Sequence, residues 1–321
     1  MYAIHVEGDD LVWRETDGLS CGPGQVRIRV AASAVNRADL VQRQGGYPPP
    51  PGASPILGLE CAGEVLEIGE GVQRVSVGDA VCALLAGGGY AAEVVVPAGQ
   101  VLPIPRGFSF AQAAAVPEVF ATAYLNLYME AALKPGERVV LHAGASGVGT
   151  AAIQMLKHSD NPVFVTAGSQ AKVNACIDLG AEAGSDRHTG SFLEAVRGWA
   201  PDGVDVILDP VGAGYLADNL QALGLGGRLV IIGLMGGVEA PVNLAALMMK
   251  RMRVIGSTLR ARPISEKAAV MDALYQNIWP QLESGAIVPV VDSEFAIADA
   301  ASAHARIATN ETVGKVILNM P

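Results

Sequence analysis

The chain has 321 residues, of which 50% are hydrophobic and 17% charged, and its formal net charge is −10. This composition excludes a disordered chain and supplies enough apolar material for more than one core. No long basic run is present, so neither nucleic acid nor an anionic membrane surface is indicated as a partner, and a small molecule is the expected ligand.

No segment of the sequence reads as a signal peptide or a membrane span. Residues 1–12 carry acids and lack an apolar core, so a cytoplasmic location is expected. The most apolar region, 229–249, is interrupted by glycine, proline and glutamate, which predicts a buried strand followed by a helix. The four cysteines are far apart and form no C-x-x-C pair, which predicts reduced, buried thiols and neither a disulfide scaffold nor a structural zinc site.

Short β-type runs separated by glycine and proline occupy the first 105 residues. The clearest are residues 25–31, 63–68, 80–84 and 91–96, and together they predict a compact β domain. Between them, residues 45–52 read GGYPPPPG. Proline fixes φ and has no backbone N–H, so this segment is predicted to be an exposed, stiff loop.

From about Glu118 strand and helix patterns alternate. A strand at 138–141, a glycine-rich turn and a helix through His158 form the entry of a doubly wound fold. Further strands are predicted at 163–166, 204–208, 229–232 and 254–257, with a weak one at 181–185, and helices at 171–179, 215–223 and 244–250. The β pattern returns at 288–291 and 315–318. We therefore predict an α/β fold in which a dinucleotide-binding domain, residues 118–261, is inserted into a mostly β substrate domain, residues 1–117 and 262–321.

The turn after the first of these strands has the composition of a phosphate-binding loop. The segment LHAGASGVG meets the G-x-G-x-x-G pattern at Gly144 and Gly149, while Ser146 replaces the middle glycine. Small residues there let backbone N–H groups approach a pyrophosphate, and the Ser146 hydroxyl can donate a hydrogen bond to it.

The end of the next strand indicates which dinucleotide is bound. An NAD enzyme places Asp or Glu there against the ribose 2′-hydroxyl, but this chain has Gly168, Ser169 and Gln170. No carboxylate repels a 2′-phosphate at this point, and Ser169 and Lys172 can donate to one. The sequence therefore predicts NADPH as the cofactor.

Several segments together resemble the medium-chain dehydrogenase/reductase superfamily, and within it the zeta-crystallin-like quinone oxidoreductases. They are NRADL from Asn36, YPPPPGAS from Tyr47, ILGLECAG from Ile56, HAGASGVGTA from His142, TAGSQ from Thr166 and GLMGG from Gly233. The resemblance runs through nearly the whole length. It implies a GroES-like substrate domain, a six-stranded Rossmann domain, a cofactor cleft between them and a homodimer or homotetramer.

The resemblance also implies roles for individual residues. Asn36 and Thr122 are expected near the nicotinamide and its ribose, and Tyr47 in the substrate cleft, as positioning residues of the catalytic site. The other expected contacts of NADPH are the pyrophosphate contacts Ser146, Gly147 and Val148, the 2′-phosphate contacts Gly168, Ser169 and Lys172, and the nicotinamide wall of Leu234, Met235, Thr258 and Leu259. Arg187 replaces a tyrosine that relatives often have at the adenine end, and it either adds charge to the phosphate pocket or points to water.

Each catalytic candidate has a purely structural alternative. Asn36 could satisfy only buried backbone groups, Tyr47 could pack on the proline loop, and Thr122 could be an ordinary helix residue. Related alcohol dehydrogenases bind catalytic zinc through a cysteine and a histidine whose places are taken here by Asn36 and Leu59, with only Glu60 remaining. One carboxylate is a poor zinc site, so no metal is predicted and Glu60 is expected to be structural. His142 is expected to pack in the core rather than to act in catalysis.

A dinucleotide motif without zinc predicts an NADPH:quinone oxidoreductase acting on a small quinone or another conjugated carbonyl. A quinone is already a good acceptor, so it needs less Lewis-acid help than a simple ketone, and the protein supplies position and a dry site. Two alternatives stay open. The first is an NADPH-dependent enone or enoyl reductase. The second, from another class, is an NADPH-binding structural or redox-sensing protein with little turnover.

Overall fold

The computed structural model describes residues 1–321, the whole chain. It divides into two compact units, one formed by Met1–Ala121 with Leu259–Pro321 and the other by Thr122–Thr258. The second unit is thus an insertion in the sequence of the first. No helix is long and apolar enough to cross a membrane.

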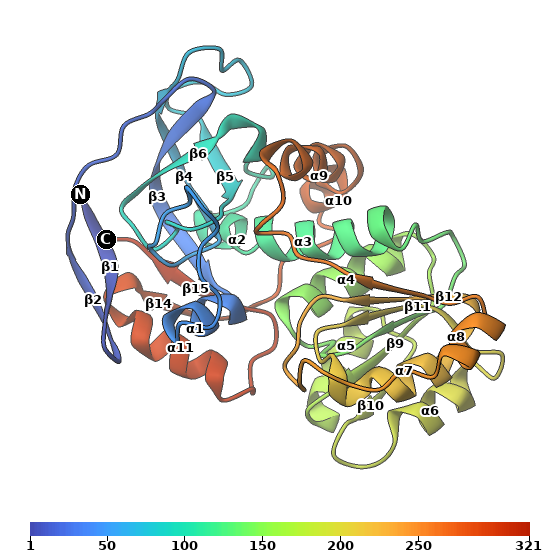
Figure 1. Ribbon diagram of the computed structural model, residues 1–321. Helices are drawn as coiled ribbons and strands as arrows, with labels where there is room; N and C mark the ends of the chain where they lie inside the picture. The colour runs from blue at the N-terminus through green and yellow to red at the C-terminus, as the bar shows by residue number, and fades with distance from the viewer. The chain divides into compact units, whose positions relative to one another are not determined.

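The first unit is built on a seven-stranded sheet with the order β14-β15-β3-β4-β5-β7, in which β6 also pairs with β3. Its central strand β3 reads QVRIRVAASAV and buries alternate side chains at Val26, Ile28 and Val30, the pattern of a strand with one face in the core. The C-terminal strand β15 pairs with β3, and β3 pairs with β4 (Figure 1). Residues from the two ends of the chain are therefore neighbours in this sheet.

The remaining elements of the first unit cover this sheet or extend it. Helix α11 packs with the β1–β2 hairpin around a core that includes Ile4, Leu11 and Ile307. The strands are β1 (Tyr2–Glu7), β2 (Asp10–Glu15), β3 (Gln25–Val35), β4 (Glu60–Ile68), β5 (Ala80–Leu84), β6 (Glu93–Pro97), β7 (Val101–Pro103), β14 (Val291–Ala296) and β15 (Lys315–Asn319). The helices are α1 (Arg37–Arg43), η1 (Ala98–Gln100), α2 (Phe110–Ala114), α9 (Ile264–Asn277), α10 (Trp279–Ser284), η4 (Ile297–Asp299) and α11 (Ala300–Ala308), and α3 (Pro117–Tyr124) runs across the boundary between the units.

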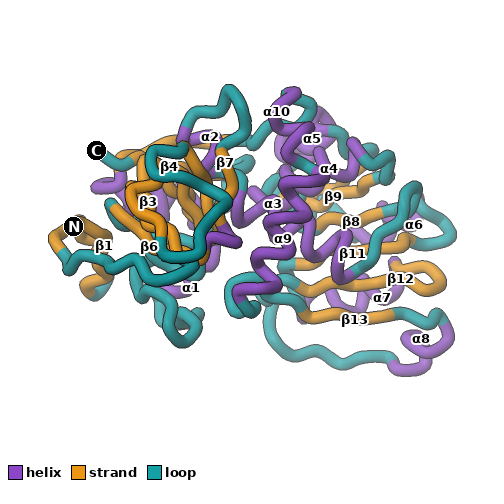
Figure 2. The backbone as a smooth tube through the Cα atoms, turned by 90° about the horizontal axis from the view of Figure 1, so that it is seen from above, coloured by secondary structure: helices purple, strands orange, loops and turns teal.

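The second unit contains a six-stranded parallel sheet with the order β10-β9-β8-β11-β12-β13. Figure 2 shows its strands side by side, with β13 at one edge. The chain forms one half of the sheet with β8, β9 and β10 and then crosses over to form the other half, starting with β11. The place where the neighbouring strands β8 and β11 meet is the topological switch point, where ligands of such sheets bind. The predicted combination of a doubly wound parallel sheet with a mostly β domain is confirmed.

Helices cover the central strands of the second unit, because β8, β9 and β11 are buried along nearly their whole length. Helices α6 and α7 share one core cluster with Val140, Phe164 and Ile207. The strands are β8 (Val139–Leu141), β9 (Val163–Ala167), β10 (Ala183–Asp186), β11 (Val204–Asp209), β12 (Leu223–Ile231) and β13 (Arg253–Gly256). The helices are the π-helix η2 (Leu125–Glu130), α4 (Gly147–His158), α5 (Gln170–Leu179), α6 (Phe192–Trp199), η3 (Ala213–Tyr215), α7 (Leu216–Ala222) and α8 (Leu244–Met249).

Two predicted strands begin at the wrong residue. The strand predicted at 288–291 is absent, because Pro289 cannot donate to a ladder, and β14 begins only at Val291. The helix predicted at 215–223 is present as α7, but Leu223 already begins β12, six residues before the predicted start of that strand at 229. The three glycines between Leu223 and Arg228 disfavour a helix, and Leu223 pairs with Val204 instead.

Candidate functional site

Apart from Thr122, the predicted cofactor contacts of the second unit follow the carboxyl ends of its parallel strands. The Ser146 turn follows β8, Gly168 and Ser169 follow β9, and Arg187 follows β10. Leu234 and Met235 follow β12 in the same way. Parallel strands end at one edge of their sheet, so the fold gathers on that edge residues that are widely separated in the sequence.

The turn after β8 is compact because its glycines touch each other. A methyl group at Gly149 would lie 2.3 Å from the carbonyl oxygen of Gly144, and one at Gly144 would lie 2.7 Å from Val165. Ser146 caps helix α4, and its Oγ accepts from the N–H of Gly149 at 3.1 Å. That bond uses a lone pair and leaves the hydroxyl proton available. The turn thus presents the Ser146 hydroxyl beside a helix N-terminus, which favours an anion.

A second polar group lies at the ends of β9 and β10. Ser169 caps helix α5 by accepting from the N–H of Lys172 at 3.3 Å. A methyl group at Gly168 would lie 3.8 Å from Nε and Nη2 of Arg187, so this guanidinium sits beside the end of β9. The carboxylate of Asp186 is turned to the backbone N–H of His188 at 2.9 Å. The structure therefore places Arg187 beside Gly168, and both cations, Arg187 and Lys172, belong to this strand edge.

A buried polar chain lies at the switch point itself. Asp209 ends β11, and its carboxylate accepts from the N–H groups of Val211 and Gly212 and from Nδ2 of Asn219, at 2.6, 3.2 and 3.0 Å. The oxygen of Asn219 then accepts from Nε2 of His142 at 2.7 Å. Burial raises the pKa of the Asp209 carboxyl to about 6 and lowers the pKa of His142 to about 4, so the imidazole is neutral at pH 7.

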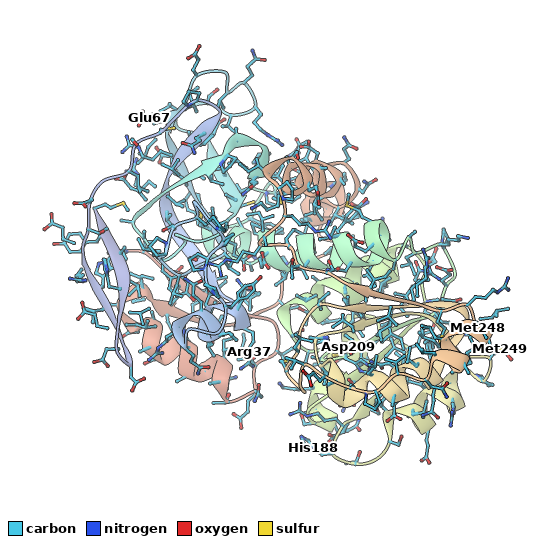
Figure 3. All side chains as sticks on the ribbon, in the orientation of Figure 1. Arg37, Glu67, His188, Asp209, Met248 and Met249 are labelled. Atoms are coloured by element: carbon cyan, nitrogen blue, oxygen red, sulfur yellow. The ribbon has the colours of Figure 1, made fainter.

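The hydrogen-bonded residues His142, Asn219 and Asp209 order the loop that carries the predicted nicotinamide wall. Asp209 fixes the turn at Val211, whose carbonyl accepts from the N–H of Gly236 at 2.7 Å, directly after Leu234 and Met235. Both wall side chains are more than half exposed, whereas Asp209, labelled in Figure 3, is fully buried. His142 packs edge-on against aromatic rings. It is a core residue, in agreement with the sequence analysis, which did not single out Asp209.

In the first unit, Asn36 lies in a buried network with Glu60 and Lys315. Asn36 follows β3 directly, Glu60 begins β4 and Lys315 begins β15, so the three neighbouring strands place these side chains together. Lys315 Nζ lies 2.7 Å from Glu60 Oε1 and 2.7 Å from Asn36 Oδ1. Glu60 Oε2 accepts from the N–H of Glu118 at 2.8 Å. The sequence analysis missed Lys315 because only its strand could be predicted.

The start of helix α1 is fixed by a second buried carboxylate, that of Asp39. It accepts from the N–H groups of Asn36 and Gly58 at 2.8 and 3.0 Å and from the hydroxyl of Tyr90 at 3.3 Å. The hydroxyl of Tyr90 also bonds Nε2 of His304. Burial raises the pKa of Asp39 to about 6 and lowers that of His304 to about 4. The backbone at Asn36 is therefore held as firmly as its side chain.

Tyr47 is anchored by a buried arginine. The guanidinium of Arg260 lies 5.1 Å from the centre of the Tyr47 ring, and it donates to the Tyr47 carbonyl at 3.2 Å and to Oε1 of Gln42 at 2.7 Å. Burial raises the pKa of the Tyr47 hydroxyl, so it stays protonated at neutral pH. The structure thus fixes the Tyr47 end of the proline loop, which has no helix or strand, as predicted.

The remaining predicted residues lie in the sequence where one unit ends and the other begins. Thr122 is in helix α3, and its carbonyl accepts from Nδ2 of Asn126 at 2.7 Å, in the π-helical turn η2. Thr258 is exposed and follows β13, whereas the next residue, Leu259, is buried.

The donor set of the alcohol dehydrogenase zinc site does not fit a metal here. Leu59 is a buried apolar side chain, and Glu60 already bonds the ammonium of Lys315. Asn36 offers only a neutral amide. Across the chain, no group of three or more His, Cys, Asp or Glu side chains is arranged to hold a metal ion.

Comparisons with known proteins agree with this architecture. Two family profiles match: alcohol dehydrogenase GroES-like domain over residues 22–106 and zinc-binding dehydrogenase over residues 147–276. The chain is 31% identical over 313 residues to the human synaptic vesicle membrane protein VAT-1 homolog, covering 92% of this chain and 79% of that protein. It is 33% identical over 99% of its length to the mycocerosic acid synthase-like polyketide synthase of Mycobacterium tuberculosis, but spans only 15% of that protein.

A solved structure gives the same result. The quinone oxidoreductase of Escherichia coli complexed with NADPH is 27% identical and has a TM-score of 0.86, covering 99% of this chain and 98% of that chain. The fold, the glycine-rich turn and these matches define an oxidoreductase with a GroES-like domain and a Rossmann domain. The chain belongs to the medium-chain dehydrogenase/reductase superfamily, as its sequence segments indicated.

Proposed function

We propose that the chain is a zinc-independent NADPH:quinone oxidoreductase of the zeta-crystallin-like type. The quoted segments also resemble the tumour-suppressor-inducible quinone oxidoreductase. The observation that carries the proposal is the strand edge where Arg187 lies beside Gly168 and Lys172 follows in the first turn of α5, with a helix N-terminus at Ser146. Two phosphate groups separated by a ribose need two such anion sites. The NADPH complex of the Escherichia coli enzyme supports this choice of cofactor.

The residues of this chain would hold and orient the two reactants. NADPH, when bound, supplies a hydride to the acceptor. Leu234 and Met235, with Thr258 and Leu259, would wall the nicotinamide, and Asn36 and Thr122 would position it and its ribose. Tyr47, held by Arg260, would line the place of the acceptor. A quinone needs no Lewis acid, which fits a Glu60 carboxylate that is already neutralised by Lys315.

An acceptor assay tests this proposal. We expect the purified protein to oxidise NADPH when a small ortho- or para-quinone is added, with much lower activity for NADH, and with the same rate before and after treatment with a chelator. Absorbance of the reduced nicotinamide measures the rate. Loss of activity in chelator that zinc restores would contradict the zinc-independent assignment.

One observation favours a second candidate, an NADPH-dependent enone or enoyl reductase. The chain matches a segment of a polyketide synthase at 33% identity over nearly its whole length. The same assay decides, because rapid turnover of α,β-unsaturated ketones or thioesters without turnover of quinones would select this candidate. Tight NADPH binding without turnover of any acceptor would instead select a structural or redox-sensing protein.

We also propose that the chain forms a homodimer through the edge strand β13. Its outer edge has no partner strand, Val254 on it is 42% exposed, and Met248 and Met249 of the neighbouring helix α8 are 71% and 74% exposed (Figure 3). Sedimentation is expected to give twice the chain mass of 33.1 kDa, and Val254→Lys to give a monomer. Val77→Lys, at another exposed valine, is the control. A monomeric wild type would contradict this proposal.

A further inference from the structure

The side-chain amide of Asn36 is held on both polar atoms by a buried ion pair. Lys315 Nζ lies 2.7 Å from Asn36 Oδ1, and Asn36 Nδ2 lies 2.9 Å from the Glu60 oxygen that Lys315 also contacts. The side chains of Glu60 and Lys315 are 0% and 4% exposed, so water hardly screens these contacts. A flipped amide would set its NH2 group against the ammonium and its oxygen against the carboxylate. The ion pair therefore fixes one orientation of the amide.

In this orientation every N–H of the Asn36 side chain is already used. Nδ2 has two protons, and its partners are Glu60 Oε1 at 2.9 Å and the carbonyl of Ala34 at 3.3 Å. The oxygen has two lone pairs, of which Lys315 takes one. The nearby N–H of Asp39 donates to the backbone carbonyl of Asn36 at 2.9 Å. Asn36 is partly exposed, and what its side chain can offer a ligand is an acceptor oxygen.

The ion pair that imposes this orientation is itself fully bonded. Lys315 uses its three protons on Glu60, Asn36 and the carbonyl of Val35 at 3.1 Å. The second oxygen of Glu60 accepts from the N–H of Glu118 at 2.8 Å. A buried ion pair that is hydrogen-bonded in this way has one favoured geometry, and its contacts with Asn36 fix the orientation of the Asn36 amide as well.

We propose that Lys315 is a positioning residue which, together with Glu60, makes Asn36 a hydrogen-bond acceptor toward bound ligand. The ligand group that meets Asn36 is then a hydroxyl and not a carbonyl oxygen. Such a hydroxyl can come from the nicotinamide ribose or from a reduced quinone. The inference rests on the proposed function. It gives Asn36 the role of holding a reactant, and it means that Asn36 does not polarise the carbonyl group of the acceptor.

The positioning role is tested with a pair of substitutions that leaves no bare charge. Lys315→Met with Glu60→Gln is expected to remain folded and to lower kcat/KM about tenfold or more, while Lys315→Arg keeps most of the activity. The matched control is Arg27→Met with Glu67→Gln and Glu93→Gln, the ion-paired group near the other end of β3, which should leave kcat/KM unchanged. Thermal unfolding verifies that each variant is folded. Wild-type kcat/KM in a folded Lys315→Met/Glu60→Gln protein would overturn the proposal.

The acceptor role is tested by moving the carboxylate. Asn36→Asp with Glu60→Gln keeps one negative charge beside Lys315, keeps an oxygen at position 36 and removes all of its N–H donors. It should keep kcat/KM within about threefold of wild type, whereas Asn36→Leu should lose tenfold or more. A raised dissociation constant for NADPH in Asn36→Leu, measured without acceptor, assigns the hydroxyl to the ribose; a raised inhibition constant for the hydroquinone product, with an unchanged dissociation constant for NADPH, assigns it to the reduced quinone. Equal loss in both folded variants would overturn the inference, whereas failure of the wild type to use NADPH would overturn the proposed function.

Discussion

Replacing Lys172 with alanine is expected to weaken NADPH binding by about ten- to a hundredfold and NADH binding by about twofold or less. In the proposed site the Lys172 ammonium would form a charge-assisted contact with the 2′-phosphate, which NADH lacks, so only NADPH should lose affinity. Lys172 lies in the first turn of α5, directly after the Ser169 cap. Calorimetric titration of wild type and variant with each dinucleotide measures both losses.

Two further variants make this comparison specific. Arg187→Ala should have the same selectivity, because the Arg187 guanidinium lies beside Gly168 at the same strand edge. Lys157→Ala is the matched control, since Lys157 lies in the last turn of α4, at the opposite end from the Ser146 cap. An equal loss of affinity for NADPH and NADH in Lys172→Ala would show that this lysine does not contact the 2′-phosphate.

The Lys172 region could be predicted from the sequence because its residues are close in the chain. The β8 turn, the Gly168–Ser169 corner and Lys172 all lie within one continuous strand–helix–strand–helix segment from β8 to α5, and their apolar and glycine patterns mark where each element ends. Most of the parallel strands were predicted for the same reason. A short apolar run marks a strand of such a sheet, and five of its six strands are clear in the sequence for this reason.

The network around Asn36 could not be predicted, because its partners are far apart in the chain. Lys315 lies 279 residues from Asn36, and only the pairing of β15 with β3 makes them neighbours. Arg260 and Tyr47 are separated by 213 residues in the same way. The sequence shows Asp209 only as an acidic residue at the end of an apolar strand. Its burial and its contact with Asn219 depend on helix α7, whose packing the pattern does not specify.

Adding a single methyl group at Gly149 is expected to remove most dinucleotide binding and to lower kcat/KM for NADPH by about a hundredfold, because displacing binding groups by about 1 Å has effects of that size. In Gly149→Ala the new atom would lie 2.3 Å from the oxygen and 2.7 Å from the Cα of Gly144, and these are backbone atoms that cannot rotate away. The turn must open, and the Ser146 cap with the helix N-terminus moves from the place of the pyrophosphate.

A matched glycine in the same unit separates this effect from simple loss of stability. Gly198→Ala in helix α6 places its methyl group where nothing lies within 4 Å, and it should bind NADPH as the wild type does. Circular dichroism verifies that both variants keep their secondary structure, and titration with NADPH gives both affinities. Wild-type affinity in a folded Gly149→Ala protein would mean that the dinucleotide does not depend on this turn. The proposed cofactor site would then be wrong, because in that proposal the pyrophosphate is held at this turn and Lys172 and Arg187 hold only the 2′-phosphate.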